Sequence, residues 1–232
     1  MTFGTLFHYS NVPLVQWFLA SYLKEGLSAL RFSKRIRPSW ITAHRMQRKM
    51  RRGMVDWYSI YRLGGLVDMD DAFVDGRRCR AKSSRPTEGK TPILMAVDNR
   101  GSKSGFIAVE ATLAIFTEHF RPFAKGYLLP WQLTCMDGLV ALPVLGETQQ
   151  DEGCVPPTER MNESPPQVHI AIGYFKTYLL GPFYGPIGRY LQEHLDKFVC
   201  RFDRRLWETE LPLRLLNAGI DLAPARLAAD NG

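Results

Sequence analysis

The 232-residue sequence lacks the features that mark a secreted, membrane or zinc-ribbon protein. Its four cysteines, Cys79, Cys135, Cys154 and Cys200, show no C-x-x-C spacing, which argues against a zinc ribbon within this chain and favours reduced intracellular thiols. No apolar run reaches membrane-spanning length, and residues 1–12 lack the basic segment and apolar core of a secretory signal. We therefore expect a cytoplasmic protein with no membrane partner.

Acidic residues are absent from one long stretch. Between Arg31 and Arg52 the sequence has nine Lys and Arg residues and no acid. The formal net charge is +7 and the pI is about 9.3, which indicates an anionic partner, most simply nucleic acid. The chain is 45% hydrophobic, enough for a sizeable core, and its length suits one ordinary domain plus a small one.

Helical patterns cover residues 13–25, 29–36 and 40–52, and the basic stretch lies in the second and third of them. Ser28 and Ser39 are expected to cap the second and third helices, and Arg37-Pro38 separates them. Three short helices with tight turns are typical of a helix-turn-helix. The third takes the place of a recognition helix and carries Arg45, Arg48, Lys49, Arg51 and Arg52. The pattern favours DNA binding over its alternative, a solvated basic face on a helical bundle.

Residues 65–76 alternate as a strand should, with an unusual content of aspartate. Asp68 and Asp70 are expected on one face, and Val67, Met69 and Asp71 on the other. A carboxylate at the centre of a buried strand needs a cation, a proton or hydrogen bonds. Binding of a hard ion such as Mg2+ is one solution, and an exposed acidic edge strand is the alternative.

Further strands are expected over 92–98, 105–110 and 128–136, with a turn at 99–101 and helical spacing over 111–124. Asp137 follows the last strand, a common site position, although Asp-Gly is also good turn chemistry. Loops are expected over 77–90 and 147–166.

From Gln167 the chain is expected to be helical, with His169 and Lys176 near one face. A lone His on such a face is more often structural than functional, which is the alternative for His169. A later helix, over 187–207, carries a second basic patch of Arg201, Arg204 and Arg205.

Taken in order, these motifs resemble the insertion-sequence DDE transposases of the ISXO-like group, also called the insertion-sequence-fifteen-ninety-five family. The strand with the family's first catalytic Asp is matched by 67–76, so that Asp falls on Asp70. The family's Asp-Gly turn is matched by 136–138, which gives Asp137. Its C-terminal signature is matched by Lys176, 181–185 and 190–205. The resemblance spans roughly residues 13–218.

The chain departs from this family at several points. The family has an N-terminal four-cysteine zinc ribbon that this sequence does not show. Its third catalytic residue is Glu, Asn or His, seven residues before the Lys, which gives His169 here. The stretch 181–185 is altered, and 147–166 does not look like the family. These departures make a truncated or decaying copy a second hypothesis.

The resemblance implies an α/β fold: an RNase H-like core, with a mixed sheet and flanking helices, preceded by a small helix-turn-helix domain. We expect the helix-turn-helix region at 1–56, the core at 62–218 with a polar insertion at 147–166, and a frayed tail at 219–232. It also implies two-metal phosphoryl transfer with Mg2+ or Mn2+, held by Asp70, Asp137 and His169, while Lys176 holds a phosphate.

The implied partner is double-stranded DNA, both transposon ends and target, bound by a homo-oligomer in association with the bacterial nucleoid. The first hypothesis is an active transposase. The second is a catalytically inactive remnant that only binds DNA. A third, from another class, is a helix-turn-helix regulator whose C-terminal domain binds a ligand. Inverted repeats and an upstream four-cysteine reading frame in the genomic flanks would discriminate among them.

Overall fold

The structure is a computed structural model, and it describes residues 5–8, 10–22, 27–56, 61–75, 90–113, 117–130, 133–136, 167–180, 191–205 and 210–221. The chain is mixed α/β and divides into two compact units. One unit comprises residues 1–60 and 204–232, and the other residues 61–203. The expected loops over 77–89 and 147–166, together with Asp137, lie outside the described residues.

Three helices form the N-terminal part of the first unit: α1 (Leu14–Tyr22), α2 (Ala29–Ile36) and α3 (Trp40–Asp56). Their boundaries follow local chemistry that the sequence shows. The Ser28 side chain accepts the Arg31 N–H at 3.4 Å, and the Ser39 hydroxyl accepts the Thr42 N–H at 3.2 Å. Arg37 ends α2 in the left-handed conformation, with φ of 67°. The three expected helices are present, and α3 extends beyond its predicted end at residue 52, while residues 23–25 of the first predicted helix lie outside the described residues.

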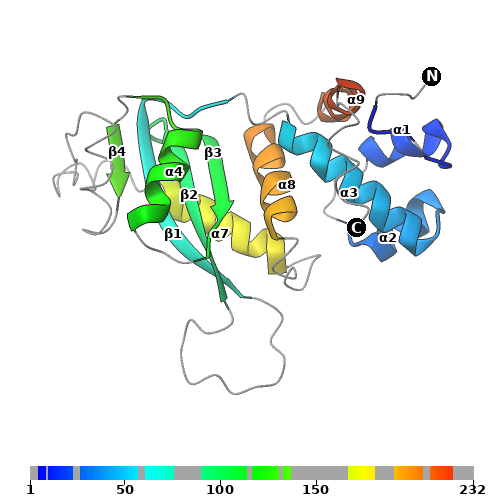
Figure 1. Cartoon of the computed structure of the whole chain (residues 1–232), viewed down its shortest axis with the longest axis horizontal. Helices are drawn as coiled ribbons and strands as arrows, with labels where there is room; N and C mark the ends of the chain where they lie inside the picture. The colour runs from blue at the N-terminus through cyan, green and yellow to red at the C-terminus, as the bar shows by residue number, and fades with distance from the viewer. Residues whose placement is uncertain are drawn as a thin grey trace, which may run out of the picture. The chain divides into compact units, whose positions relative to one another are not determined.

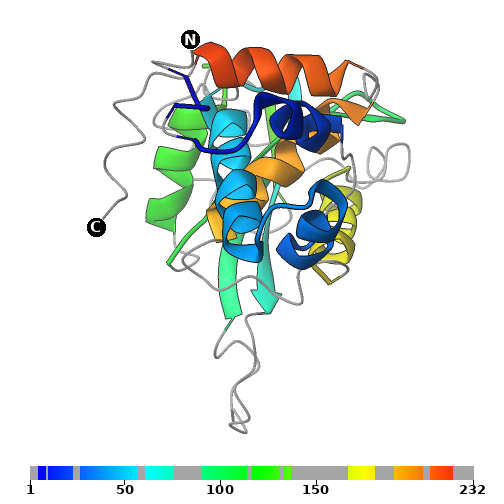
Figure 2. The ribbon, with the colours of Figure 1, turned by 90° about the vertical axis from the view of Figure 1, so that its right-hand side faces the viewer.

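The C-terminal helix α9 (Leu211–Asp221) belongs to this same unit, with the N-terminal helices α1 and α3 (Figure 2). The Leu6 N–H donates to the Gly219 carbonyl at 2.7 Å, and Leu216 joins the buried apolar cluster around Trp17 and Met46. From the sequence, residues 204–218 were expected in the core and 219–232 in a frayed tail. In the structure, α9 continues to Asp221 because its apolar side is buried against the N-terminal helices.

The second unit contains a four-stranded sheet in the order β3-β2-β1-β4 (Figure 1). Its strands are β1 (Leu66–Asp75), β2 (Lys90–Asn99), β3 (Ser104–Ala111) and β4 (Leu133–Met136). The strands β1, β2 and β3 pair antiparallel, and β4 lies parallel to β1. The predicted turn follows β2, with Gly101 at φ of +75° and its N–H bonded to the Asn99 side chain. The acidic strand is therefore central in the sheet and not at its edge.

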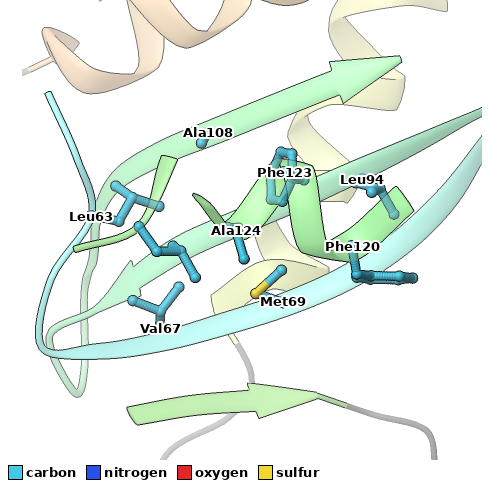
Figure 3. Packing of buried hydrophobic residues seen from close by; sticks show 10 residues of the cluster. Leu63, Val67, Met69, Leu94, Ala108, Phe120, Phe123 and Ala124 are labelled. Carbon is cyan, nitrogen blue, oxygen red and sulfur yellow. The ribbon is translucent and has the colours of Figure 1, made fainter. Parts of the chain in front are cut away.

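Helix α4 (Thr117–Tyr127) covers one face of the sheet. Figure 3 shows Phe120, Phe123 and Ala124 of α4 packed against Val67 and Met69 of β1, and all five side chains are buried. Since side chains alternate along a strand, this packing directs Asp68 and Asp70 to the opposite face. The face assignment made from the sequence is confirmed for these residues.

Two more helices pack against strands of the sheet: α7 (Gln167–Leu180) and α8 (Leu191–Asp203). Helix α7 contacts β1 and β2 and carries the buried Ala171 and Phe175. Helix α8 lies along the edge strand β3. None of the described helices is both long and apolar enough to cross a membrane.

Candidate active site

Asp70 lies in the middle of β1, and its carboxylate is held in a defined orientation. Oδ1 accepts the N–H of Asp71 at 2.8 Å. Oδ2 points to α7, where His169 Nδ1 lies 3.2 Å away. The Asp70 side chain is 18% exposed and the His169 side chain 46%, so the pair is reachable from solvent. Two of the three predicted catalytic residues are therefore adjacent, although 99 positions separate them in the sequence.

Asp70 and His169 both line an open pocket of about 540 Å³. Lys176 lines it together with His169, Ile172 and Gly173, so these residues share one face of α7 as the helical spacing predicted. The sheet side of the pocket is formed by Asp70, Asp71, Ala72, Phe73 and Lys90. The Asp70–His169 pair thus shares one cavity with two lysines, an arrangement suited to a metal-bound or phosphate-bearing ligand.

Asp71 and Lys90 also line the pocket but were not predicted as site residues. Asp71 was predicted to face away from Asp70, as alternation along β1 requires, and its half-burial raises the pKa of its carboxyl through desolvation. Lys90 is the first residue of β2 and pairs with Asp75, at the end of β1. It was assigned to a loop, because the predicted strand began two residues later. The position of Lys90 follows from the pairing register of β1 and β2, which the sequence alone does not show.

Asp68 shares a face with Asp70 but has different surroundings. It is 5% exposed, and its Oδ2 accepts the Asn99 side-chain N–H and the Gln167 backbone N–H, both at 2.8 Å. Desolvation raises the pKa of this carboxyl, while the hydrogen bonds from Gln167 and Asn99 and the nearby His169 oppose that rise. Asp68 is absent from the pocket lining, so its carboxylate is structural where that of Asp70 is accessible.

The third predicted residue, Asp137, lies outside the described residues. Strand β4 ends at Met136, whose backbone pairs with Met69, the neighbour of Asp70. Within the described part of the chain, no group of three or more His, Cys, Asp and Glu residues could hold a metal ion. The 3.2 Å between Asp70 and His169 suits two ligands of one ion, because neighbouring ligands of an octahedral ion with ~2.1 Å bonds are ~3.0 Å apart.

The predicted DNA-binding residues of α3 differ in exposure. Arg45 is exposed, while Arg48 and Lys49 are half-buried. Lys49 Nζ donates to the His8 carbonyl at 3.0 Å, and burial lowers its pKa. Arg51 is 5% exposed, which corrects its assignment to a DNA-contacting surface, because a buried guanidinium cannot reach a phosphate. The side chain of Arg52 lies outside the described residues.

In the second predicted basic patch, one of the three arginines is also buried. Arg204 is 5% exposed, so it is not available to DNA. Arg201 and Arg205 are each half-buried, with part of their side chains at the surface.

No protein-family model and no curated protein matches this sequence. The resemblance to ISXO-like transposases therefore depends on the motifs themselves. Among solved structures, the chain is similar to the mariner Mos1 paired end complex with Mg, with 10% identity and a TM-score of 0.35, over 91% of this chain and 81% of that one.

Two further structures are similar to the same extent. The Mos1 strand transfer complex has 11% identity and a TM-score of 0.34, over 91% of this chain and 81% of that one. The pre-cleavage Mos1 transpososome also has 11% identity and a TM-score of 0.34, over 93% and 81%. These neighbours are transposase complexes, but TM-scores of this size do not establish a shared fold.

Proposed function

We propose that this protein is a DDE transposase of the insertion-sequence type, which cleaves and joins DNA strands at transposon ends. One observation carries the proposal: Asp70 comes from the strand motif, His169 and Lys176 come from the C-terminal motif, and all three residues line one pocket. The motif match used the order of these residues and the seven-residue spacing from His169 to Lys176. It did not use the contact between Asp70 on β1 and His169 on α7, so this contact is independent support.

The sheet supports an RNase H-like core. Asp70 lies on a central strand of a mixed sheet, and β4, which precedes Asp137, is its parallel neighbour. The resemblance implies acids on adjacent strands followed by a helix, and α7 provides that helix.

Asp70 and His169 would hold a divalent cation, with Asp137 as the further ligand. When bound, Mg2+ or Mn2+ supplies activation of the attacking oxygen and stabilisation of the leaving oxygen. The ammonium group of Lys176 would bind a DNA phosphate as a point charge. Imidazole is a softer ligand than carboxylate, so His169 favours Mn2+ over Mg2+.

The decisive experiment uses purified protein, Mn2+ and pre-nicked DNA that carries the element's own ends. Wild type is expected to join or nick this DNA, and Asp70→Asn to abolish the reaction while DNA binding persists, because the swap keeps the shape but removes the charge. Asp98→Asn, on β2 outside the pocket, is the matched control and should stay active. His169→Glu should keep or raise activity with Mg2+, since oxygen ligands suit that ion.

A catalytically inactive DNA-binding remnant is the second candidate. It is favoured by the contact between His169 and Asp70, because a protonated imidazole at 3.2 Å would neutralise the carboxylate in place of a cation. Metal-independent DNA binding, with no cleavage or joining of pre-nicked ends by wild type, would establish this reading. Exposed cations of the helical unit, above all Arg45, are proposed to bind the DNA in either case.

A further inference from the structure

Helix α7 begins with an unusual connection to the sheet. The first N–H groups of a helix have no acceptor within the helix. The N–H of Gln167, the first residue of α7, donates instead to the Asp68 carboxylate across 99 residues of sequence. A carboxylate at this end also interacts favourably with the helix dipole.

The side chain of Gln167 makes a second set of contacts. Its Nε2 donates to the Gly101 carbonyl at 3.1 Å, and its Oε1 accepts the Ser104 hydroxyl at 2.9 Å. Gln167 is itself buried, and Asn99 donates to the same Asp68 oxygen. The start of α7 is thus tied to β1, to the end of β2 and to the turn that follows it.

The same strand and helix carry the candidate catalytic pair two residues further along. Asp70 follows Asp68 on one face of β1, and His169 follows Gln167 on α7. A shift of α7 by one helical turn, about 5.4 Å, would separate His169 from Asp70. The buried contact between Asp68 and Gln167 opposes such a shift, because the shift would remove one of the two donors of a buried carboxylate.

We propose that Asp68 is a positioning residue, which with Asn99 and Gln167 fixes the start of α7 on β1 and so sets the distance between Asp70 and His169. This proposal rests on the proposed function only because it takes Asp70 and His169 as the metal-binding pair. Asp68 is not proposed as a metal ligand, because its Oδ2 already accepts two hydrogen bonds and its side chain does not line the pocket.

The test compares Asp68→Ala, Asp68→Asn and wild type in the full chain. Asp203→Ala is the matched control, since Asp203 is also a buried carboxylate that accepts a backbone N–H, from Ile107 at 2.9 Å, but on α8. Two quantities are measured: hydrogen exchange of the α7 peptide by mass spectrometry, and Mn2+ affinity by calorimetry.

Asp68→Ala is expected to speed exchange in the first turn of α7 at least tenfold and to weaken Mn2+ binding at least tenfold. Asp68→Asn keeps an acceptor oxygen and should stay within about threefold of wild type on both measures. Asp203→Ala should lose stability but keep α7 exchange and Mn2+ affinity near wild type. If Asp68→Ala does not fold, Gln167→Ala replaces it, with a three- to tenfold effect expected on both.

Unchanged α7 exchange in Asp68→Ala would overturn the proposal. Faster exchange with unchanged Mn2+ affinity would also overturn it, because Asp68 would then be structural without positioning the pair. Failure of the proposed function gives a different result: wild type itself would not bind Mn2+, or Asp70→Asn would bind it equally well. In that case the exchange measurement still decides whether Asp68 fixes the start of α7.

Discussion

Asp196 on α8 is the residue whose surroundings have the clearest measurable consequence. Desolvation raises the pKa of its carboxyl to about 6; the hydrogen bond from Gln192 opposes this rise, and Glu193 and Glu110 add to it. Glu110, on β3, also has its pKa raised by burial. The region where α8 meets β3 therefore binds protons more tightly in the folded protein than in the unfolded chain.

This raised pKa predicts a loss of stability as the pH increases. A carboxyl with an unfolded pKa of ~4 and a folded pKa near 6 favours folding most below pH ~4, and that contribution is lost as the pH rises through 6. Asp196→Asn should raise the free energy of unfolding at pH 8 by up to ~3 kcal/mol and change it little at pH 4. Urea unfolding from pH 4 to pH 8 measures this effect.

The control for this prediction is Asp98→Asn, which removes a carboxylate that bonds Arg100 and not α8. It should leave the Asp196-dependent slope between pH 4 and pH 6 in place. A variant Asp196→Asn with the same pH slope as wild type would contradict the assignment.

Among the elements, α8 provides hydrogen-bond partners for backbone groups of the strand β3. Gln192 Oε1 accepts the Ala111 N–H at 2.9 Å, and its Nε2 donates to the Val109 carbonyl at 3.3 Å and to Asp196 at 2.9 Å. The edge strand is thereby covered, as sheet edges in soluble proteins usually are. Gln192→Leu should lower the free energy of unfolding by about 1–3 kcal/mol, because it leaves strand groups without partners. Chemical denaturation measures the loss, and an unchanged midpoint would contradict this role.

Two glycines should respond in opposite directions to the same change. A Cβ at Gly173, on the pocket face of α7, would meet no atom within 4 Å, so Gly173→Ala should stabilise the helix by up to ~1 kcal/mol. A Cβ at Gly105, on β3, would collide with the Asp98 carboxylate and crowd Arg100, so Gly105→Ala should destabilise the protein. Thermal melts of both variants test this contrast. A lower melting temperature for Gly173→Ala would show that α7 does not tolerate a methyl group there.

For the whole molecule, the charge of +7 predicts DNA binding that weakens with salt. Arg45→Ala should weaken binding and reduce the slope of log affinity against log salt by about one, because an exposed cation that contacts a phosphate is lost. Arg51→Ala should leave the slope unchanged and lower stability instead, since Arg51 is buried. Binding isotherms at several salt concentrations check both. Equal slopes for Arg45→Ala and wild type would show that Arg45 on α3 does not contact the DNA.

Local sequence patterns were enough to predict several elements and the faces of their side chains. Serine caps, a helix-breaking Arg-Pro pair, strand alternation and helical spacing act over a few residues, so the helices α2 and α3, the strand β1 and the shared face of His169 and Lys176 could be predicted. The family resemblance identified Asp70 and His169, and the structure places these two side chains next to each other.

Which of these side chains solvent can reach depends instead on long-range packing. Asp68 and Asp70 are equivalent in the strand pattern, yet the start of α7 buries one and leaves the other at a pocket. Arg51 belongs to the same basic pattern as the exposed Arg45 and is nevertheless buried, and α9 packs with helices from the other end of the chain. These outcomes depend on contacts between residues distant in sequence, whose energies no local pattern contains.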